Sequence, residues 1–483
     1  MGKLEMTRLK KFSLVLGGFV AGILISLQLP AFAEKDVKAG LPIDDLRTFA
    51  EVYNAIKQGY VEPVEDKKMI ANAIAGMLSN LDPHSSYLDA EAFKDLQIGT
   101  QGEFGGLGIE VGMEDGLVKV ISPIEDTPAF RAGVKSGDLI FKLDEKAVKG
   151  MTLPDAVKLM RGKPKTQIKL SIIRKGVDKP VEITLTREVI KVKSVKSKIV
   201  EPGHAWLRIT QFQENTVPEM ALQINELYKQ GNLKGLILDL RNDPGGLLSG
   251  AIGVSAAFLP ENTKVVSTDG RTPDAKQEYL ARPADYQRQR GRTREDALKD
   301  LPAAIKTVPM VVLVNSGSAS ASEIVAGALQ DHKRAIILGT QTFGKGSVQS
   351  VLPLPGNTAI KLTTARYYTP NGRSIQAKGI VPDIIVEDTP NGSSKSFRQR
   401  EADLERHLIN EQEKDTAKES AKEAVKPAAK TPAKPAAGKG KEGREDGEEP
   451  TPARLEFASK DDYQFQQALN LLKGVQIMQQ KTK

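Results

Sequence analysis

The pattern of apolar and polar positions changes from region to region along the 483-residue chain. Between residues 43 and 89, apolar side chains such as Phe49, Val52 and Ile56 recur at helical spacing, which predicts helices that end at Pro83. Because so short a segment buries little apolar surface by itself, we expect it to dock elsewhere or to form a dimer.

A second region, from about residue 103 to residue 187, has the pattern of short strands. Residues 107–111 and 117–120 flank the turn Glu114-Asp115-Gly116, which predicts a β-hairpin. We expect further strands at 168–173 and 181–185, and a helix at 153–160.

The third region, residues 206–385, contains the continuous apolar runs Gly235–Leu240 and Met310–Val314, which are typical of strands buried on both faces. Each run leads into a turn rich in Gly or Ser and then into a helical pattern. The repeated order of strand, turn and helix predicts an α/β arrangement that gathers backbone N–H groups and side chains at the strand ends.

The last part of the chain is different in composition. Hydrophobic content falls after Pro390, and Lys426–Pro452 cannot bury enough apolar area to order itself. Asp461–Gln480 then returns to helical spacing, with Phe465 and Leu469 on one face. An amphipathic helix beyond a linker is more often an interaction handle than a core element, although it can also dock back on its own chain.

The N-terminus has the three parts of a secretory signal peptide. Four Lys or Arg residues among the first 11 precede the apolar stretch Phe12–Leu29, and Ala31-Phe32-Ala33 offers a small-x-small cleavage site. We therefore expect export to the periplasm or cell envelope with a cleaved signal at residues 1–33; a retained membrane anchor is the alternative. Any other membrane contact is expected to be peripheral.

Composition narrows the classes of function. The formal charge of +8 lies largely in the N-terminal segment and the Lys-rich tail, so no nucleic-acid-binding face is predicted. The chain has no cysteine, which excludes disulfides, thiolate metal sites and a cysteine nucleophile.

One segment has the pattern of a nucleophile site. The second apolar run ends in Asn315-Ser316-Gly317-Ser318-Ala319-Ser320-Ala321-Ser322-Glu323, after which a helical pattern begins. Small residues let a substrate backbone approach closely, and the first N–H groups of a helix can hold an oxyanion. The same serines can instead be helix N-caps, with Glu323 completing a capping box, and this segment alone favours capping.

A serine nucleophile needs a base, and the sequence indicates a lysine. The chain has four histidines and no Gly-x-Ser-x-Gly motif, so nothing points to a histidine triad. Lys345 lies between Gly344 and Gly346, after the apolar run Ala335–Leu338. A chain that descends through the helix and returns antiparallel to it can bring Lys345 to the start of the helix. A buried lysine that loses its charge is a competent base.

Five motifs, in this order, resemble the carboxyl-terminal processing proteases (tail-specific proteases) over roughly residues 43–390. They are Phe104-Gly105-Gly106-Leu107-Gly108, Arg241-Asn242-Asp243-Pro244-Gly245-Gly246, Ser318–Glu323 with Ala326–Asp331, Phe343-Gly344-Lys345-Gly346 and Gly379-Ile380-Val381-Pro382-Asp383. The resemblance implies an α/β multidomain protein. Its expected parts are a helical N-terminal segment (34–100), a PDZ domain (101–190), a crotonase-like α/β serine protease core (191–390), a flexible low-complexity linker (391–460) and a C-terminal amphipathic helix (461–483).

The resemblance also implies the catalytic residues. The family's nucleophile precedes its lysine by twenty-five residues, which selects Ser320, and its supporting glutamine follows by four, at Gln349. Residues four apart on a strand share a face, so we expect Gln349 to steer the Lys345 amine. The expected oxyanion donors are the N–H of Ala321 and one N–H of Gly245-Gly246, with Gly246 preferred. No metal or other cofactor is implied.

The PDZ-like region is expected to supply substrate binding. Its Gly105-Gly106-Leu107-Gly108 motif would hold a terminal carboxylate, with the peptide added as an extra strand. In isolation, the same glycines are equally typical of a plain β-turn.

The predicted function is an exported serine endopeptidase with a Ser–Lys dyad that recognises C-terminal tails of cell-envelope proteins and processes or degrades them. Expected partners are proteins or peptides with accessible C-termini, further copies of the chain and, from the resemblance, a lipoprotein adaptor. One alternative is a non-proteolytic PDZ scaffold or chaperone, which would not need Lys345. Another is an acyl-CoA enzyme of the crotonase type, which has little use for a PDZ domain or a signal peptide.

Overall fold

The computed structural model describes residues 42–124, 126–177, 179–287, 295–390, 399–412 and 456–481. The predicted signal peptide and the segment Lys426–Pro452 lie outside these ranges. Within them, no helix combines the length and the apolar character that crossing a membrane requires. The chain divides into two units, one ending at Asn72 and the other beginning at Ala73.

The first unit, as far as it is described, consists of α2 (Ile43–Gly59) and the beginning of α3 (Asp66–Ser79). The prediction of helices in this part is confirmed. None of the α2 residues is buried, and its apolar Phe49 is 47% exposed. An ion pair between Lys57 and Asp66, 2.8 Å apart, joins the two helices. α2 therefore contributes no buried core to this unit.

The turn after α3 belongs to the second unit. α3 ends at Ser79, so Pro83 is not the residue that ends it. The Asp82 carboxylate accepts the N–H groups of His84 and Ser85 at 2.8 and 3.0 Å and so closes the turn. The chain then forms β1 (Ser86–Leu88), which pairs antiparallel with β18 (Thr358–Tyr368), and α4 (Ala90–Gln101).

Residues 103–191 form a β-rich body with its own core, in which Val118, Ile140 and Leu170 are fully buried. Its antiparallel sheet has the order β3-β4-β5-β7-β8, with β6 beside β5 and with β2 and β9 as a separate pair. The predicted hairpin, strands and helix are confirmed. The bounds are β2 Glu103–Gly106, β3 Ile109–Glu114, β4 Leu117–Pro123, α5 Pro128–Arg131, β5 Leu139–Leu143, β6 Lys146–Ala147, α6 Leu153–Met160, β7 Gln167–Ile173, β8 Val181–Thr186 and β9 Glu188–Lys191.

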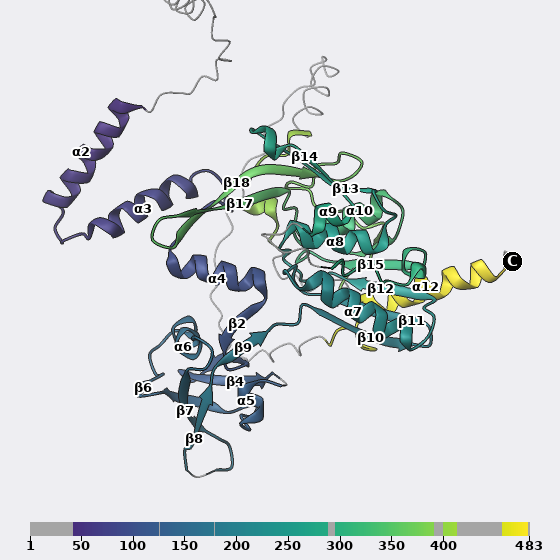
Figure 1. Ribbon diagram of the computed structural model, residues 1–483, viewed down its shortest axis with the longest axis horizontal. Helices are drawn as coiled ribbons and strands as arrows, with labels where there is room; N and C mark the ends of the chain where they lie inside the picture. The colour runs from purple at the N-terminus through teal and green to yellow at the C-terminus, as the bar shows by residue number, and fades with distance from the viewer. Residues whose placement is uncertain are drawn as a thin grey trace, which may run out of the picture. The chain divides into compact units, whose positions relative to one another are not determined.

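The central sheet of the following region has the order β10-β11-β12-β15-β16-β19 and is parallel from β11 onward. Its strands β10, β11, β12 and β15 are labelled in Figure 1. Its inner strands β12 and β15 are buried on both faces, as the apolar runs predict. One face packs against α7, α8 and α10, and the other against α12. The bounds are β10 Val195–Glu201, β11 His204–Ile209, α7 Thr216–Lys229, β12 Gly235–Asp239, α8 Leu248–Phe258, β15 Met310–Val314, α10 Ala321–Asp331, β16 Ile336–Gly339, β19 Ile384–Ile385 and α12 Tyr463–Lys481.

A second sheet of this region has the order β1-β18-β13-β14, with β17 also paired to β18. It joins residues from the turn after α3 to residues almost three hundred positions later, since Ser86 faces Lys361. The remaining bounds are β13 Lys264–Gly270, η1 Pro273–Ala275, β14 Gln277–Leu280, α9 Pro283–Tyr286, η2 Ala303–Lys306, β17 Ser347–Leu354 and η3 Glu401–Asp403.

The C-terminal helix docks on its own chain. Phe465, Leu469 and Leu472 of α12 are almost fully buried against strand residues that include Ile237 and Val311. The interpretation of this apolar face as an interaction handle is therefore wrong, because the central sheet covers it. Residues 399–412, part of the expected linker, are anchored to the core, since Glu401 and Asn410 are buried and both bond to Gln376.

Candidate active site

Ser320 stands at the junction of β15 and α10. It is the N-cap residue of α10 and has φ +55° and ψ −109°, a conformation that is rare for a residue with a side chain. The hydroxyls of its neighbours are used by the fold, since Ser318 donates to the Leu240 carbonyl at 2.8 Å and Ser322 to the Asp243 carbonyl at 3.0 Å. Of the four serines in the run, Ser320 is the one that lines a cleft.

Glu323 ties the start of α10 to the segment that carries Lys345. Its Oε2 accepts the N–H of Ser320 at 2.8 Å and that of Lys345 at 3.0 Å. Its Oε1 accepts the Gly344 N–H at 2.7 Å and the Thr342 hydroxyl at 2.6 Å. Burial raises the pKa of Glu323 to about 7, although these hydrogen bonds oppose the rise. Glu323 thus bonds the Ser320 N–H, as a capping box requires, and also positions the lysine segment.

Lys345 and Ser320 line the same cleft, which has a volume of about 680 Å³. β16 is parallel to β15, so the chain returns antiparallel to α10 as predicted and delivers Lys345 to the helix start. Burial lowers the pKa of Lys345, and the positive charge of Lys361 lowers it further. The carboxylates of Glu401, Glu323 and Asp82 act in the opposite direction.

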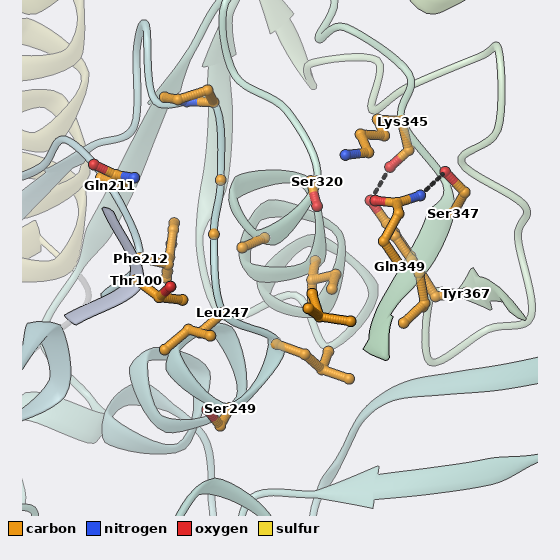
Figure 2. Close-up of a pocket in the computed structure, with 18 of the residues that line it drawn as sticks. Thr100, Gln211, Phe212, Leu247, Ser249, Ser320, Lys345, Ser347, Gln349 and Tyr367 are labelled. Atoms are coloured by element: carbon orange, nitrogen blue, oxygen red, sulfur yellow. Dashed lines mark hydrogen bonds between the residues drawn. The ribbon is translucent and has the colours of Figure 1, made fainter. Parts of the chain in front are cut away.

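A buried phenol contacts the lysine segment. The Tyr367 hydroxyl donates a hydrogen bond to the Lys345 carbonyl, and Tyr367 lines the same cleft as Ser320. Figure 2 shows the Ser320 hydroxyl on the same side of the cleft as Lys345, Gln349 and Tyr367. Tyr367 lies on β18 and was not identified from the sequence, because its strand pattern does not distinguish it from an ordinary core tyrosine.

Gln349 lines the same cleft but is not on a common strand with Lys345. β17 begins at Ser347 and has an irregular register between Val348 and Gln349, so the premise that residues 345 and 349 share a strand face is wrong. The Gln349 amide nitrogen donates to Ser347 Oγ at 3.0 Å and to Thr363 Oγ1 at 3.2 Å. These bonds hold the Gln349 side chain at the edge of the cleft.

The two glycines of the Asp243–Gly246 segment differ in what their N–H groups do. The Gly245 N–H donates to the Asp243 carboxylate at 2.8 Å. The bridge to Phe212 uses the Gly245 carbonyl and the Leu247 N–H, and so does not involve the N–H of Gly246. Gly246 is exposed in the cleft, whereas Gly245 is buried. Gly246 is therefore the better placed donor.

Gly245 brings this loop against the nucleophile. A Cβ atom at Gly245 would lie 2.9 Å from both the Ser320 Cβ and the Ala321 nitrogen, and the residue has φ +96°. Only glycine allows so close an approach. The Ala321 nitrogen, at the first position of α10, therefore lies next to the glycine loop, as an oxyanion hole requires.

All four histidines lie in the described part of the chain, and none lines the cleft. Each has a partner elsewhere: His84 with Glu401 at 2.8 Å, His204 with Gln476 at 2.9 Å, His332 with the Lys264 carbonyl at 2.7 Å, and His407 with the Leu404 carbonyl at 2.9 Å. The absence of a histidine base, expected from the sequence, agrees with this placement.

The glycine motif of the β-rich body borders a second, smaller cavity of about 110 Å³. Gly106, Leu107 and Gly108 line it, while the Gly105 carbonyl is bonded to the Gly162 N–H at 3.0 Å. The rest of the lining comes from β2, from β3 and from the second half and end of α6, and consists of Phe104, Ile109, Val111, Val157, Met160 and Arg161. A cavity between a strand and a helix, closed by a glycine turn, fits the end of an extended peptide.

Comparison with known proteins assigns the N-terminal segment, the β-rich body and the region of the central sheet to three different family models. Residues 203–386 match the model of peptidase family S41, residues 105–185 match the PDZ domain, and residues 26–92 match the N-terminal domain of the activating protease CtpB. A solved structure, the photosystem II D1 C-terminal processing protease, shares 30% identity and covers 70% of this chain and 92% of its own, with a TM-score of 0.39.

Two relatives establish the family. The carboxy-terminal-processing protease of Bartonella bacilliformis is 46% identical over 404 residues, which cover 82% of this chain and 88% of that protein. The carboxy-terminal processing protease CtpA of Bacillus subtilis is 36% identical over 338 residues, which cover 70% of this chain and 68% of that protein. The chain therefore belongs to the carboxy-terminal processing proteases, which are serine peptidases of family S41 with a PDZ domain.

Proposed function

We propose that this serine peptidase is an exported endopeptidase in which Ser320 is the nucleophile and Lys345 the general base. The observation that carries the proposal is that both side chains line one cleft, at the start of α10. Ser320 has a rare backbone conformation, and the pKa of Lys345 is lowered by burial. A lysine with a lowered pKa holds more of the neutral amine that can accept a proton.

The proposed reaction uses the neutral amine twice. Lys345 Nζ accepts the proton of Ser320 Oγ as that oxygen attacks the substrate carbonyl carbon. The ammonium then gives the proton to the leaving amine nitrogen as the peptide bond breaks, which leaves an acyl-enzyme. A water molecule that loses a proton to Lys345 then attacks the ester carbon. The bond to Ser320 Oγ breaks, the Lys345 ammonium returns the proton to that oxygen, and the released acid leaves both side chains as they began.

The negative charge on the carbonyl oxygen is assigned to two backbone donors, the N–H groups of Ala321 and Gly246. Gly246 and Ala321 line the same cleft, and the Gly245 N–H is engaged by Asp243; both observations support this choice. Gln349 is proposed as a supporting residue held by Ser347 and Thr363.

The substrates proposed are cell-envelope proteins with accessible C-terminal tails. The cavity between β3 and α6 would hold the last residues of the tail, with Gly106, Leu107 and Gly108 next to its carboxylate. Export rests on the signal-like N-terminal sequence. Self-association through the exposed apolar residues of α2 and the use of a lipoprotein adaptor are further parts of this proposal.

The test compares Ser320→Ala and Lys345→Ala with the unchanged chain on a protein that carries an apolar C-terminal tail. Each substitution is expected to lower kcat by about 10³-fold or more, because nucleophile and base act as a unit. Ser316→Ala, from the same serine run, and Lys333→Ala, a lysine outside the cleft, are the matched controls and are expected to keep full activity. Unchanged degradation by either site variant contradicts the proposed dyad.

A further inference from the structure

The C-terminal segment reaches the base of the glycine loop through one buried carboxylate. Asp462, immediately before α12, is 1% exposed. Its Oδ1 accepts a hydrogen bond from Arg241 Nη1 at 2.8 Å, and its Oδ2 accepts one from Arg241 Nη2 at 2.7 Å. This is a paired contact of a planar guanidinium with a carboxylate, the strongest form of such an interaction. Gln464 adds a further acceptor to Nη1 at 3.1 Å.

Arg241 is the first residue of the loop that continues to Gly246. On its other side the guanidinium bonds to Asp239, at the end of β12, at 3.0 and 2.7 Å. The backbone carbonyl of Arg241 accepts a hydrogen bond from Arg208 Nη2 at 2.9 Å. The side chain and the backbone of residue 241 are thus both fixed by charged groups.

Arg241 belongs to a cluster of buried charged side chains. The central sheet and the loop contribute two guanidinium groups and one carboxylate to this cluster. Arg208 and Arg241 both contact Asp239, and all three side chains are at most 8% exposed. The second carboxylate bonded to Arg241 comes from Asp462, and the Phe457 ring lies 3.7 Å from the Arg208 guanidinium. Because buried charges need partners, the C-terminal segment completes the cluster.

The loop above this cluster is also linked to the nucleophile turn. The Ser318 hydroxyl donates to the Leu240 carbonyl at 2.8 Å, and the Ala319 N–H donates to the Asp243 carbonyl at 3.0 Å. A displacement of Arg241 would therefore change the position of Gly246 relative to Ser320.

We propose that Asp462 is a positioning residue of the protease: through Arg241 it holds residues 240–246, and with them the Gly246 N–H, in place for the oxyanion. The C-terminal segment 456–481 is on this view a part of the catalytic unit. The inference rests on the proposed function, since it takes Gly246 as an oxyanion donor.

The test uses the full chain with Asp462→Asn, which keeps the size of the side chain and one acceptor oxygen but removes the charge. The matched control is Lys473→Ala, which removes the ion pair of α12 with Glu201, 2.6 Å long, and leaves Arg241 untouched. Both variants remove a contact of the C-terminal segment, and the melting temperature of each variant measures how far the fold is destabilised.

For Asp462→Asn, kcat on a peptide is expected to fall about 10- to 100-fold, with KM changed less than about twofold, because only transition-state contacts are displaced. The affinity of a peptide aldehyde, whose adduct with Ser320 places an oxygen in the oxyanion site, should fall by a similar factor. The affinity of a cleaved product peptide should not change. Lys473→Ala should keep the kcat and the aldehyde affinity of the unchanged chain.

Where Asp462→Asn does not fold, Gln464→Ala replaces it, because it removes another bond to the same guanidinium; the same changes with smaller factors are expected. Full kcat and aldehyde affinity in a folded variant overturn the inference, as does an equal loss in Lys473→Ala. Ser320→Ala separates the two proposals in the same assay. If it still cleaves, the proposed dyad fails; if it is inactive while Asp462→Asn has full kcat, only the role of Asp462 fails.

Discussion

A single phenol, that of Tyr367, contacts the lysine of the proposed dyad and lines the same cleft. Its hydroxyl donates a hydrogen bond to the Lys345 carbonyl, and the residue is 1% exposed. Tyr367→Phe removes this oxygen and keeps the ring in the core. We expect kcat/KM to fall about 10-fold, which corresponds to about 1.4 kcal/mol, the size of one buried hydrogen bond. Steady-state kinetics with a peptide substrate measures the change.

Tyr368 offers the control for this substitution, because it is the next residue of β18 and does not line the cleft. Tyr368→Phe should leave kcat/KM unchanged. The rate at which a fluorophosphonate labels Ser320 reports on the nucleophile directly and should fall in Tyr367→Phe alone. Equal labelling rates in the two variants would show that the Tyr367 hydroxyl serves the core and not the dyad.

The charge of Lys361 bears on the pH dependence of the reaction. It lowers the pKa of Lys345, in addition to the effect of burial. Since the neutral amine is the proposed base, kcat/KM should rise with pH through the pKa of Lys345. Lys361→Met removes a like charge, so the charged form of Lys345 becomes easier to hold and its pKa rises. The acidic limb of the profile should therefore move to higher pH.

A pH profile of kcat/KM for Lys361→Met, measured beside Lys196→Met, checks this sign. Lys196 is an exposed lysine on β10, in the other sheet, and its replacement should leave the profile in place. A shift to lower pH in Lys361→Met would rule out Lys345 as the base that sets the acidic limb.

At the scale of elements, the sequence patterns correctly predicted strands and helices that are determined by residues close together along the chain. The buried strands β12 and β15 follow from continuous apolar runs, and α6 begins at Leu153 and ends at Met160 as its periodicity indicates. The return of the chain along β16 also follows, because a short strand after a helix has few ways to re-enter a parallel sheet.

What the sequence could not show is which distant segments meet. The pattern of α12 established that one face is apolar, but not that the central sheet covers it. Asp462 lies more than two hundred residues after its partner Arg241, and an acidic residue before a helix looks like an ordinary cap. Gln349 was selected by the family resemblance. The expectation that it steers the Lys345 amine assumed a strand common to both residues, and the late start of β17 makes that assumption invalid.

At the scale of the whole molecule, two of the cavities that the described residues line differ in chemical character. The cleft of the candidate active site is lined by Ser320, Lys345, Gly246 and Ala321 as well as by apolar groups. The smaller PDZ cavity is lined mostly by apolar side chains, apart from Arg161 and the glycine turn. A tail-bearing substrate would use both cavities, whereas a short peptide needs only the first. A comparison of the two substrates on a variant of the PDZ cavity can therefore measure tail recognition separately from catalysis, with every domain of the chain kept.

Val157→Glu places a carboxylate in the PDZ cavity, where it would repel the terminal carboxylate of a bound tail. We expect cleavage of a protein with an apolar tail to slow about 10-fold, equivalent to about 1.4 kcal/mol of lost binding. Cleavage of a short peptide with an amidated C-terminus should stay unchanged. Val177→Glu, at a position 45% exposed between β7 and β8, is the matched control and should affect neither substrate. An equal loss on both substrates in Val157→Glu would mean that the PDZ cavity supports the catalytic cleft generally and does not select tails.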